Sequence, residues 1–242
     1  MTVEHYDWSA YHSNVRPNKI AIRDLSNNQT LTYKELDDRA NKLANWLQAN
    51  GVKKGDRVAI LSQNCAEFFE LEFACAKTGS IELPLNWRLT KPELEYILND
   101  STPHVLIYDE SFTEISIELV KACNIQRSLQ IDKQDASSEY EEAIKDATSD
   151  YEKVDCTQED LIMIMYTSGT TGHPKGAMIN HQMQLYNVIN LASPAFVGPD
   201  TVQLVVLPLF HTGGMNCYAN PVLHAGGEII LIREFDPGLA LS

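Results

Sequence analysis

The pattern that most restricts the fold of this chain is a regular alternation of helix-start signals with short apolar runs. Capping boxes, in which an N-cap side chain and a Glu three residues later satisfy each other's free backbone N–H groups, occur at 32–35, 64–67 and 90–93. Apolar runs of strand length lie between and after them, at 57–61, 81–85, 104–108 and 161–165. Strands that alternate with helices in this way indicate parallel sheets with helices on their faces. The sequence therefore predicts an α/β fold of layered, mainly parallel sheets covered by helices.

The second half of the chain continues this pattern less regularly. Residues 132–159 are polar and acidic with few large apolar side chains, and we expect a surface excursion with one short helix there. Strands are predicted at 202–206 and 228–232, and Asp236 followed by Pro237 has the form of a helix start, predicted to run through 236–241. A domain does not ordinarily stop in the first turns of a helix, so we expect residues 1–242 to be the N-terminal portion of a larger, truncated domain.

The charge of the chain argues against some classes of partner. The 19 basic and 33 acidic residues give a formal net charge of −14. Such a surface repels nucleic acids and anionic lipids, so we expect neither as a partner. It also repels anionic small molecules, and a site for one of them must build its positive potential locally, from individual lysines or arginines.

The sequence lacks the features of a membrane span, an export signal and a zinc site. No apolar stretch reaches 18 residues, and residues 1–8 lack a basic patch followed by an apolar run. No Cys-x-x-Cys pair occurs among the cysteines, which are Cys65, Cys75, Cys123, Cys156 and Cys217. The seven histidines form no His-Glu-x-x-His motif. We therefore expect a cytoplasmic protein with no membrane span, with buried, reduced thiols and without protein-bound zinc.

A loop rich in glycine and hydroxyl side chains follows the apolar run 161–165. Six of the seven residues 166–172 are Thr, Ser or Gly, and Lys175 supplies a positive charge shortly afterwards. Gly169 and Gly172 permit positive φ angles and close backbone approach, so several N–H groups can converge on one anion. Further donors are the hydroxyls of Thr167, Ser168, Thr170 and Thr171. These features are typical of a phosphate-binding loop.

Two other interpretations of this loop compete with a phosphate site. A cluster of Ser, Thr and Gly between strands is often only a solvated turn, and composition alone does not decide between the two. A phosphate loop of the common NTPase type needs Gly-Lys followed by Ser or Thr and then a helix. Here Lys175-Gly176 has the reverse order, residues 177–179 favour a strand, and the next helix is predicted to begin near Asn180 or His181. The NTPase type of loop is therefore excluded.

The run from Tyr166 to Gly176, Tyr-Thr-Ser-Gly-Thr-Thr-Gly-His-Pro-Lys-Gly, resembles the signature of the adenylate-forming superfamily, which contains acyl-CoA synthetases, peptide-synthetase adenylation domains and luciferases. The resemblance implies that the loop closes over the β- and γ-phosphates of ATP. It also implies that Lys175 contacts phosphate and that Thr167 helps to hold the Mg²⁺ bound to ATP. Segments 85–98 and 224–231 are similar to acyl-CoA synthetases of the fatty-acid–CoA ligase branch. Residues 1–242 would then be the N-terminal portion of the AMP-binding (adenylation) domain.

The resemblance also locates a pocket for the substrate acid, in segment 207–216. The acyl-pocket residues that it implies are His211, Gly213, Met215 and Asn216, and further candidates for the lining are Phe196 and Val197. Peptide-synthetase adenylation domains usually have an Asp near the position of His211, where its charge holds the α-ammonium group of an amino acid. Histidine lacks that fixed charge, so an aliphatic or aromatic carboxylic acid without an α-amine is favoured. Taken alone, a histidine at this position is more often a structural hydrogen-bonding residue.

The implied reaction is the ATP-dependent activation of a carboxylic acid to acyl-AMP, followed by transfer of the acyl group to the thiol of coenzyme A. Positioning and charge neutralisation by Mg²⁺, loop amides and lysine suffice for the first step, without a covalent protein nucleophile. The resemblance puts the catalytic lysine in a C-terminal domain that this chain lacks, so we expect no catalytic residue in the fragment and no activity from it alone. Two alternatives stay open: an enzyme that loads a carrier-protein thiol, and a non-catalytic half-protein acting as a binding module.

Two smaller questions also stay open. A homodimer of the full-length protein is compatible with the resemblance. Arg88, in the first similar segment, is either a ligand-binding residue or a partner in a salt bridge beside the helix that follows it.

Overall fold

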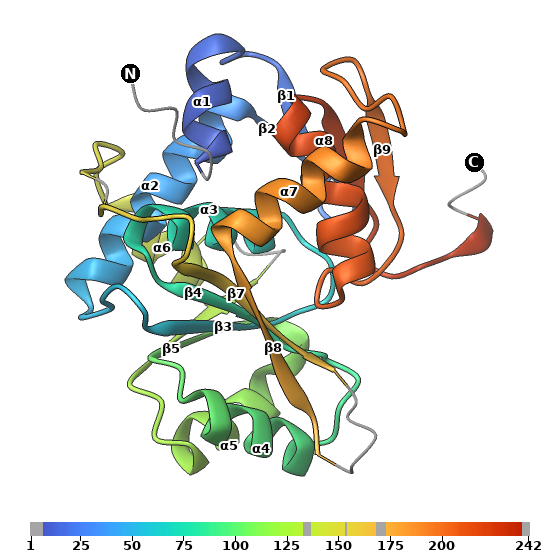
Figure 1. The fold of residues 1–242 in the computed structure, drawn as a ribbon. Helices are drawn as coiled ribbons and strands as arrows, with labels where there is room; N and C mark the ends of the chain where they lie inside the picture. The colour runs from blue at the N-terminus through green and yellow to red at the C-terminus, as the bar shows by residue number, and fades with distance from the viewer. Residues whose placement is uncertain (1–6, 133–136, 153, 168–172, 239–242) are drawn as a thin grey trace.

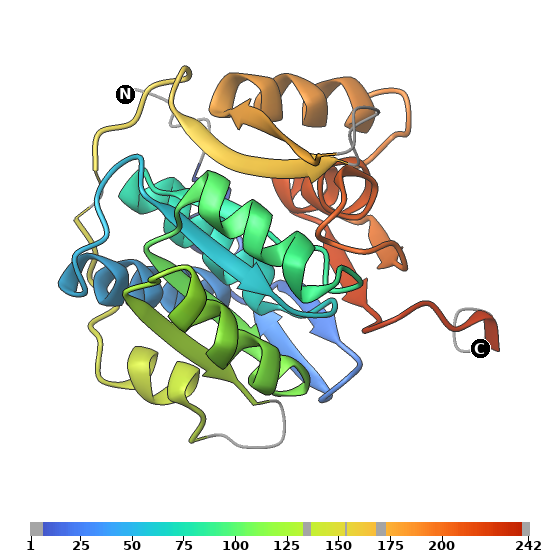
Figure 2. The same ribbon diagram turned by 90° about the horizontal axis from the view of Figure 1, so that it is seen from below.

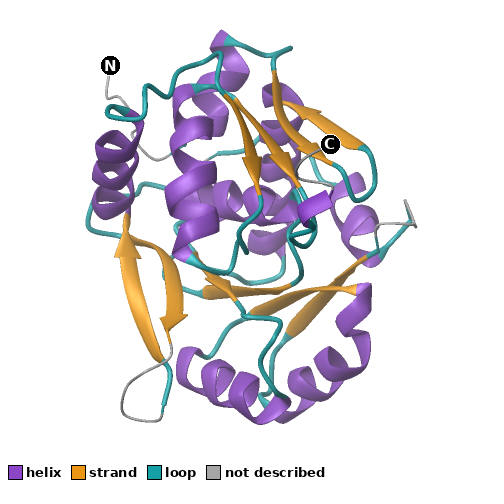
Figure 3. Cartoon of the chain, turned by 90° about the vertical axis from the view of Figure 1, so that its right-hand side faces the viewer, coloured by secondary structure: helices purple, strands orange, loops and turns teal. Residues whose placement is uncertain are grey.

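The computed structural model of the chain describes residues 7–132, 137–152, 154–167 and 173–238. Two β-sheets lie one above the other with helices between and outside them (Figure 1, Figure 3). The strands are β1 (Ile20–Asp24), β2 (Gln29–Thr32), β3 (Arg57–Leu61), β4 (Ile81–Pro84), β5 (Val105–Asp109), β6 (Arg127–Ile131), β7 (Leu161–Thr167), β8 (Lys175–Asn180), β9 (Val202–Val205) and β10 (Glu228–Leu231). The α-helices are α1 (Trp8–Val15), α2 (Tyr33–Ala49), α3 (Glu67–Thr78), α4 (Lys91–Ser101), α5 (Thr113–Ala122), α6 (Glu139–Lys145), α7 (His181–Ala192) and α8 (Asn220–Ala225). A 3₁₀-helix, η1 (Glu110–Phe112), and a π-helix, η2 (Gly213–Ala219), complete the described elements.

Both sheets are mainly parallel, as the alternation of strands and helices predicts. The larger sheet has the strand order β6-β5-β3-β4-β7-β8, and the smaller one has the order β2-β1-β10-β9. Each contains one antiparallel edge strand: β8 returns beside β7, and β2 returns beside β1. Each of these two strands follows its partner directly in the order of described elements, with no helix between them.

Helices cover both faces of the larger sheet. On one face α4 and α5 pack side by side, and their apolar residues form a cluster with strand residues such as Leu83 and Leu106 (Figure 2). On the other face α2 and α3 lie between the two sheets (Figure 1). There a larger cluster joins Ile22 of β1 with Phe69 of α3 and Ile60 of β3. The smaller sheet therefore shares one core with the larger one.

Most of the predicted elements are confirmed within about one residue. The capping boxes at Thr32 and Thr90 form as expected, with Glu35 and Glu93 accepting from the backbone N–H of each N-cap at 2.8 and 2.7 Å. Gly79 ends α3 with a φ of 69°, in the left-handed region that glycine adopts without strain. These signals depend only on residues a few positions apart, so the sequence contains all the information that they need.

The capping box predicted at 64–67 is wrong. Helix α3 begins at Glu67 after Ala66, which makes no side-chain cap. Asn64 instead donates to the backbone oxygens of Leu207 and Ile232 at 3.0 and 3.2 Å, and accepts from the N–H of Leu209 at 2.8 Å. Its side chain thus joins the turn after β3 to the turns after β9 and β10, which belong to the other sheet. Hydrogen bonds to distant segments of the chain therefore replace the predicted helix cap.

The polar segment 132–159 is more tightly packed than a surface excursion. Its short helix α6 buries Tyr140 and Ile144. The hydroxyl of Tyr140 donates to Glu70 of α3 at 2.7 Å, and Arg39 of α2 binds both Glu70 and Glu141. An ion-paired network therefore attaches this acidic stretch to the helices between the sheets.

Other expectations are met only in part. Strand β7 continues to Thr167, two residues beyond the predicted end. All five cysteines are free thiols, but only Cys65 and Cys75 are buried. Cys123 and Cys156 are half-buried and Cys217 is exposed, which contradicts the expectation that all are buried. The helix predicted at 236–241 lies partly outside the described residues. No helix in the described ranges has both the length and the apolar character needed to cross a membrane.

Candidate active site

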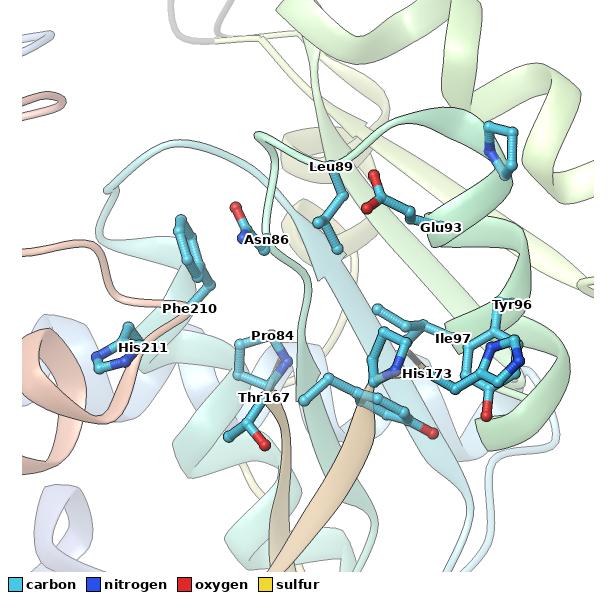
Figure 4. A pocket seen from close by; sticks show the side chains of 13 residues that line it. Pro84, Asn86, Leu89, Glu93, Tyr96, Ile97, Thr167, His173, Phe210 and His211 are labelled. Carbon is cyan, nitrogen blue, oxygen red and sulfur yellow. The ribbon is translucent and has the colours of Figure 1, made fainter. Parts of the chain in front are cut away.

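A pocket of about 660 Å³ opens at the carboxyl ends of β4 and β7 (Figure 4). Ligands of open parallel sheets bind at this edge, because the loops that leave the strands meet there. One wall is α4 with the turn before it, another is formed by the two ends of the β7–β8 hairpin, and the third is the turn after β9. The α4 wall contributes Glu93, Tyr96 and Ile97 to the lining. The hairpin contributes Thr167 and His173, and the turn after β9 contributes Phe210 and His211.

The β7–β8 hairpin places the two ends of the predicted phosphate loop opposite each other. The antiparallel register pairs Thr167 with Lys175 and Tyr166 with Gly176. A Cβ atom at Gly176 would lie 2.8 Å from Cγ2 of Ile164, so a side chain directly after Lys175 would force Ile164 to shift. This contact favours glycine at that position. The remaining predicted loop residues, Ser168, Gly169, Thr170, Thr171 and Gly172, lie outside the described residues.

Helix α4 anchors both arms of this hairpin. The hydroxyl of Tyr166 donates to Oδ2 of Asp100 at 2.5 Å, and burial together with this carboxylate raises the pKa of Tyr166. On the returning arm, the ring of His173 stacks on Tyr96 with centroids 4.9 Å apart and an interplanar angle of 21°. Neither Tyr96 nor Asp100 is predicted from the sequence to have a role here. Only the position of Tyr96 within segment 85–98 pointed toward it.

His211 lies on the wall opposite α4 (Figure 4). Its Nδ1 accepts a hydrogen bond from the backbone N–H of Gly213 at 3.2 Å. An accepting Nδ1 carries no proton, so the proton of the neutral ring is on Nε2. His211 can therefore present an N–H donor, the group that a bound carboxylate needs.

The other predicted acyl-pocket residues occupy different places. Gly213 begins η2 directly after the turn that carries His211. Met215 and Asn216 are 0% and 5% exposed and lie behind the pocket wall, where the amide of Asn216 contacts Sδ of Met165 at 3.6 Å. Phe196 and Val197 line a separate groove beside His224, away from His211. Of the predicted acyl-pocket residues, His211 lines the described pocket. That the others line an acyl pocket stays a prediction.

Gly214, which the sequence analysis did not single out, makes the closest backbone contact in this region. A Cβ atom there would lie 2.3 Å from the backbone oxygen of Pro208 and 2.6 Å from that of Leu207. We expect Gly214→Ala to lower the free energy of unfolding by about 1–3 kcal/mol, since backbone cannot yield as a side chain does. Urea denaturation followed by circular dichroism measures this change.

Gly213→Ala is the matched control for Gly214→Ala. Its added methyl group would meet the side chains of Leu207 and His211 at 3.2 and 3.4 Å, and these can move. The control should therefore cost less than Gly214→Ala. Equal losses in the two variants would contradict the backbone-contact explanation.

Two cationic side chains lie next to lining residues of the pocket: Lys175 pairs with Thr167, and Arg88 contacts Phe210. The exposed Lys175 stands at the end of the hairpin. The guanidinium of Arg88 lies 4.8 Å from the ring centroid of Trp87 and 5.8 Å from that of Phe210, a pocket-lining residue. Arg88 thus stacks on two aromatic rings. Two cations are available to an anionic ligand.

Comparison with known proteins agrees with this geometry. The chain matches the family model described as AMP-binding enzyme over residues 9–241. It is 37% identical over 235 residues to a feruloyl-CoA synthase of Amycolatopsis sp, an alignment that covers 97% of this chain and 45% of the relative. It is 31% identical over 231 residues to the fatty acid–[acyl-carrier-protein] ligase ScoC of Streptomyces coeruleorubidus, covering 94% of this chain and 43% of the relative. The chain thus spans about half the length of the curated relatives that it matches.

A solved structure shows the same architecture. ATP-bound MatB from Rhodopseudomonas palustris superimposes with a TM-score of 0.87 and 31% identity, over 98% of this chain and 47% of that protein. The family match extends over nearly the whole sequence and includes the hairpin and the pocket described above. The chain therefore belongs to the AMP-binding family of adenylate-forming enzymes.

Proposed function

We propose that this chain is the N-terminal portion of the adenylation domain of a cytoplasmic acid–thiol ligase, which activates a carboxylic acid with ATP and passes the acyl group to coenzyme A. The observation that supports this most directly is the β7–β8 hairpin. It sets Thr167 opposite Lys175 beside the pocket that His211 lines. A phosphate-binding group and a carboxylate-binding group then face one space.

The chemistry follows from the charges of the two reactants. In the first step a carboxylate oxygen bonds to the α-phosphorus of ATP, and the bond to pyrophosphate breaks. Both reactants are anions, so Lys175 and Arg88 lower the repulsion between them, and Nε2–H of His211 donates to a carboxylate oxygen. In the second step the thiolate of coenzyme A attacks the acyl carbon, and AMP leaves.

Magnesium would accompany ATP in this proposal, with Thr167 as its protein neighbour. Mg²⁺ prefers hard oxygen ligands and usually keeps waters and substrate phosphates, with only one or two groups from the protein. The hydroxyl of Thr167, which lines the pocket, fits that role. Nowhere in the described ranges do three or more His, Cys, Asp or Glu side chains gather as a metal site of their own. The ion would neutralise phosphate charge during the attack.

The lining of the pocket favours an acid with an apolar body. Leu89, Ile97 and Phe210 provide apolar surface, and His211 carries no fixed negative charge to hold an ammonium group. The one acidic residue of the described lining, Glu93, is bound to Thr90 in the capping box of α4. The similarity to a feruloyl-CoA synthase supports an aromatic acid, and the similarity to the fatty acid ligase ScoC supports a fatty acid. The similarity to ScoC keeps a carrier-protein thiol as the second candidate for the acyl acceptor.

A pyrophosphate-release screen of the full-length protein tests this proposal. The assay supplies Mg-ATP with aryl, aliphatic, dicarboxylic or α-amino acids, with and without coenzyme A. We expect release with acids that lack an α-amine, and formation of a thioester only when coenzyme A is present. Release that only α-amino acids support, or a thioester that forms only on a carrier protein, would contradict it.

The 242-residue chain alone serves as the comparison in the same assay. Because it spans about half of its relatives, we propose that it exchanges pyrophosphate into ATP at no more than the background rate. Robust exchange by this chain alone would contradict that part of the proposal. A full-length protein that binds ATP but is silent with every acid would favour a non-catalytic binding module.

A further inference from the structure

A buried polar network lies directly behind the wall of the pocket that carries His211. The wall continues into η2, a π-helix, which is a rare conformation that often occurs at functional sites. Asn216 of η2 is 5% exposed. Its side-chain oxygen accepts from the amide of Asn220 at 3.2 Å, and its backbone oxygen accepts from the amide of Asn187 at 2.8 Å. The side-chain amides of Asn187 on α7 and of Asn220, where η2 continues into α8, therefore hold η2.

The network ends on a carboxyl group of α3. Asn220, the fully buried first residue of α8, also donates to Oε1 of Glu72 at 2.8 Å. Gln184 of α7 donates to the same oxygen at 2.5 Å. A single amide group, that of Asn220, thus connects Glu72 with Asn216. The path runs from the helix between the two sheets to the π-helix beside the pocket.

The carboxyl group of Glu72 is costly to keep in this position. The residue is 2% exposed, and no described group hydrogen bonds to its Oε2. Burial raises its pKa to about 7, although the amides of Asn220 and Gln184 favour the ionised form. Glu82 of β4 is fully buried as well, and burial followed by the charge of Glu72 raises its pKa well above the usual range. A well-packed apolar residue would avoid this cost, so stability does not explain Glu72.

Several other titratable groups lie around Glu72, and those that form ion pairs do so with other residues. On α3 itself Glu70 pairs with Arg39, and Lys77 pairs with Asp7 and Asp37. Cys75 lies within reach of both Glu82 and Glu72. On α7 the buried His181 precedes Gln184 by one turn, and on α8 His224 packs against Trp8. Glu72 takes part in no ion pair within the described residues, and its hydrogen-bond donors there are the amides of Asn220 and Gln184.

A displacement of η2 would reach His211 through two short links. The N–H of Met215, in the first turn of η2, donates to the backbone oxygen of His211 at 3.2 Å. The N–H of Gly213 donates to Nδ1 of His211 at the same distance. The second link also fixes which ring nitrogen carries the proton. The orientation of the His211 ring therefore depends on where η2 lies.

We propose that Glu72 is a positioning residue for the acid pocket: by binding Asn220 it fixes η2, and through η2 it fixes the ring of His211. The effect on substrate rests on the proposed function, while the effect on η2 does not. Glu72→Gln keeps a side-chain oxygen that can accept from Asn220. Glu72→Met has a similar size and keeps no such oxygen. The two variants separate the hydrogen bond from the space that the side chain fills.

Hydrogen exchange of this chain, followed by mass spectrometry, tests the structural half of the proposal. In Glu72→Met we expect amides of residues 213–219 to exchange about 10-fold faster or more, the size expected when the buried amide of Asn220 loses its acceptor. Glu72→Gln should exchange as the unchanged chain does, and so should residues 57–61 of β3 in every variant. Asn220→Leu breaks the same path from the other side and should reproduce Glu72→Met. Unchanged exchange at 213–219 in both, or an equal increase at 57–61, would overturn the proposal.

Gln184→Met is the matched control, because it removes the other amide on Glu72 Oε1 without touching η2. Its exchange at 213–219 should stay within about twofold of the unchanged chain, well below the loss of a hydrogen bond to η2. In the full-length enzyme, Glu72→Met should raise the KM for the acid about 10-fold and leave the KM for ATP unchanged, with rescue by Glu72→Gln. Equal changes in both KM values would overturn the link to the acid pocket. A full-length protein that activates no acid would refute the proposed function, and the exchange result would still decide whether Glu72 holds η2.

Discussion

Replacing Lys175 by alanine is expected to lower kcat/KM for adenylation by the full-length enzyme about 10- to 150-fold, the loss of about 1.5–3 kcal/mol of bonding to an ionised group. Lys175 begins β8 opposite Thr167 and is exposed at the end of the hairpin. The rest of the chain repels ATP, since its net charge is −14. Few other cations lie close enough to compensate, so the loss should be large. Pyrophosphate release at varied ATP concentration measures it.

Lys145→Ala is the matched control for Lys175→Ala. It removes the same charge from the exposed end of α6, where Lys145 pairs with Glu142 at 3.0 Å. Adenylation should then stay within about twofold of the unchanged enzyme, as expected for an exposed pair. Both variants should unfold at the same urea concentration as the unchanged protein. A Lys175→Ala enzyme with unaltered KM for ATP and unaltered kcat would contradict the phosphate-binding assignment.

Replacing Lys77 by methionine is expected to lower the free energy of unfolding by about 3–5 kcal/mol, because it leaves two carboxylates buried without their cation. Lys77 of α3 has a side chain only 2% exposed, and its ammonium group lies 2.8 Å from Asp7 and 2.7 Å from Asp37. Asp7 caps α1 and Asp37 lies on α2. One buried ammonium group thus joins three helices on one side of the core. Urea denaturation of this chain measures the change.

Lys34→Met is the control for Lys77→Met. Lys34 has a side chain 60% exposed and, among the described residues, pairs with Asp38, one turn along α2. Its loss should leave the urea midpoint indistinguishable from that of the unchanged chain, as expected for an exposed helix pair. Adding Asp37→Asn to Lys77→Met should recover part of the loss, because it removes one of the two stranded charges. A Lys77→Met protein as stable as the Lys34→Met protein would show that the buried triad is not what holds these helices together.

The elements that sequence predicts well are those whose signals are local. Thr32 and Thr90 find their partners three residues away, so their boxes form whatever the rest of the chain does. Asn64 has the same local option, but its partners Leu207, Leu209 and Ile232 are distant in the sequence. Three tertiary hydrogen bonds outweigh one cap. Residues 64–67 alone therefore do not predict that Asn64 binds these distant backbone groups.

The predictions for the candidate site also succeed for local features and fail for tertiary contacts. The phosphate loop and His211 were predicted from residue types and from resemblance, and the structure brings Thr167, Lys175 and His211 to one edge of the sheet. The anchors Tyr96 and Asp100 were missed, because their roles exist only once α4 packs beside the hairpin. The buried path through Glu72 was missed too. A Glu within a predicted helix gives no indication that amides of two other helices will hydrogen bond to it in the folded chain.

The order of the strands also restricts how this protein can be made. Strand β1 pairs on one side with β2, only a few residues away, but on the other side Ile22 pairs with Ile229. During synthesis the first hairpin leaves the ribosome long before its central neighbour β10 exists. Until then it exposes an open edge, of the kind that pairs with other chains. The smaller sheet can therefore be completed only after β10 has been synthesised.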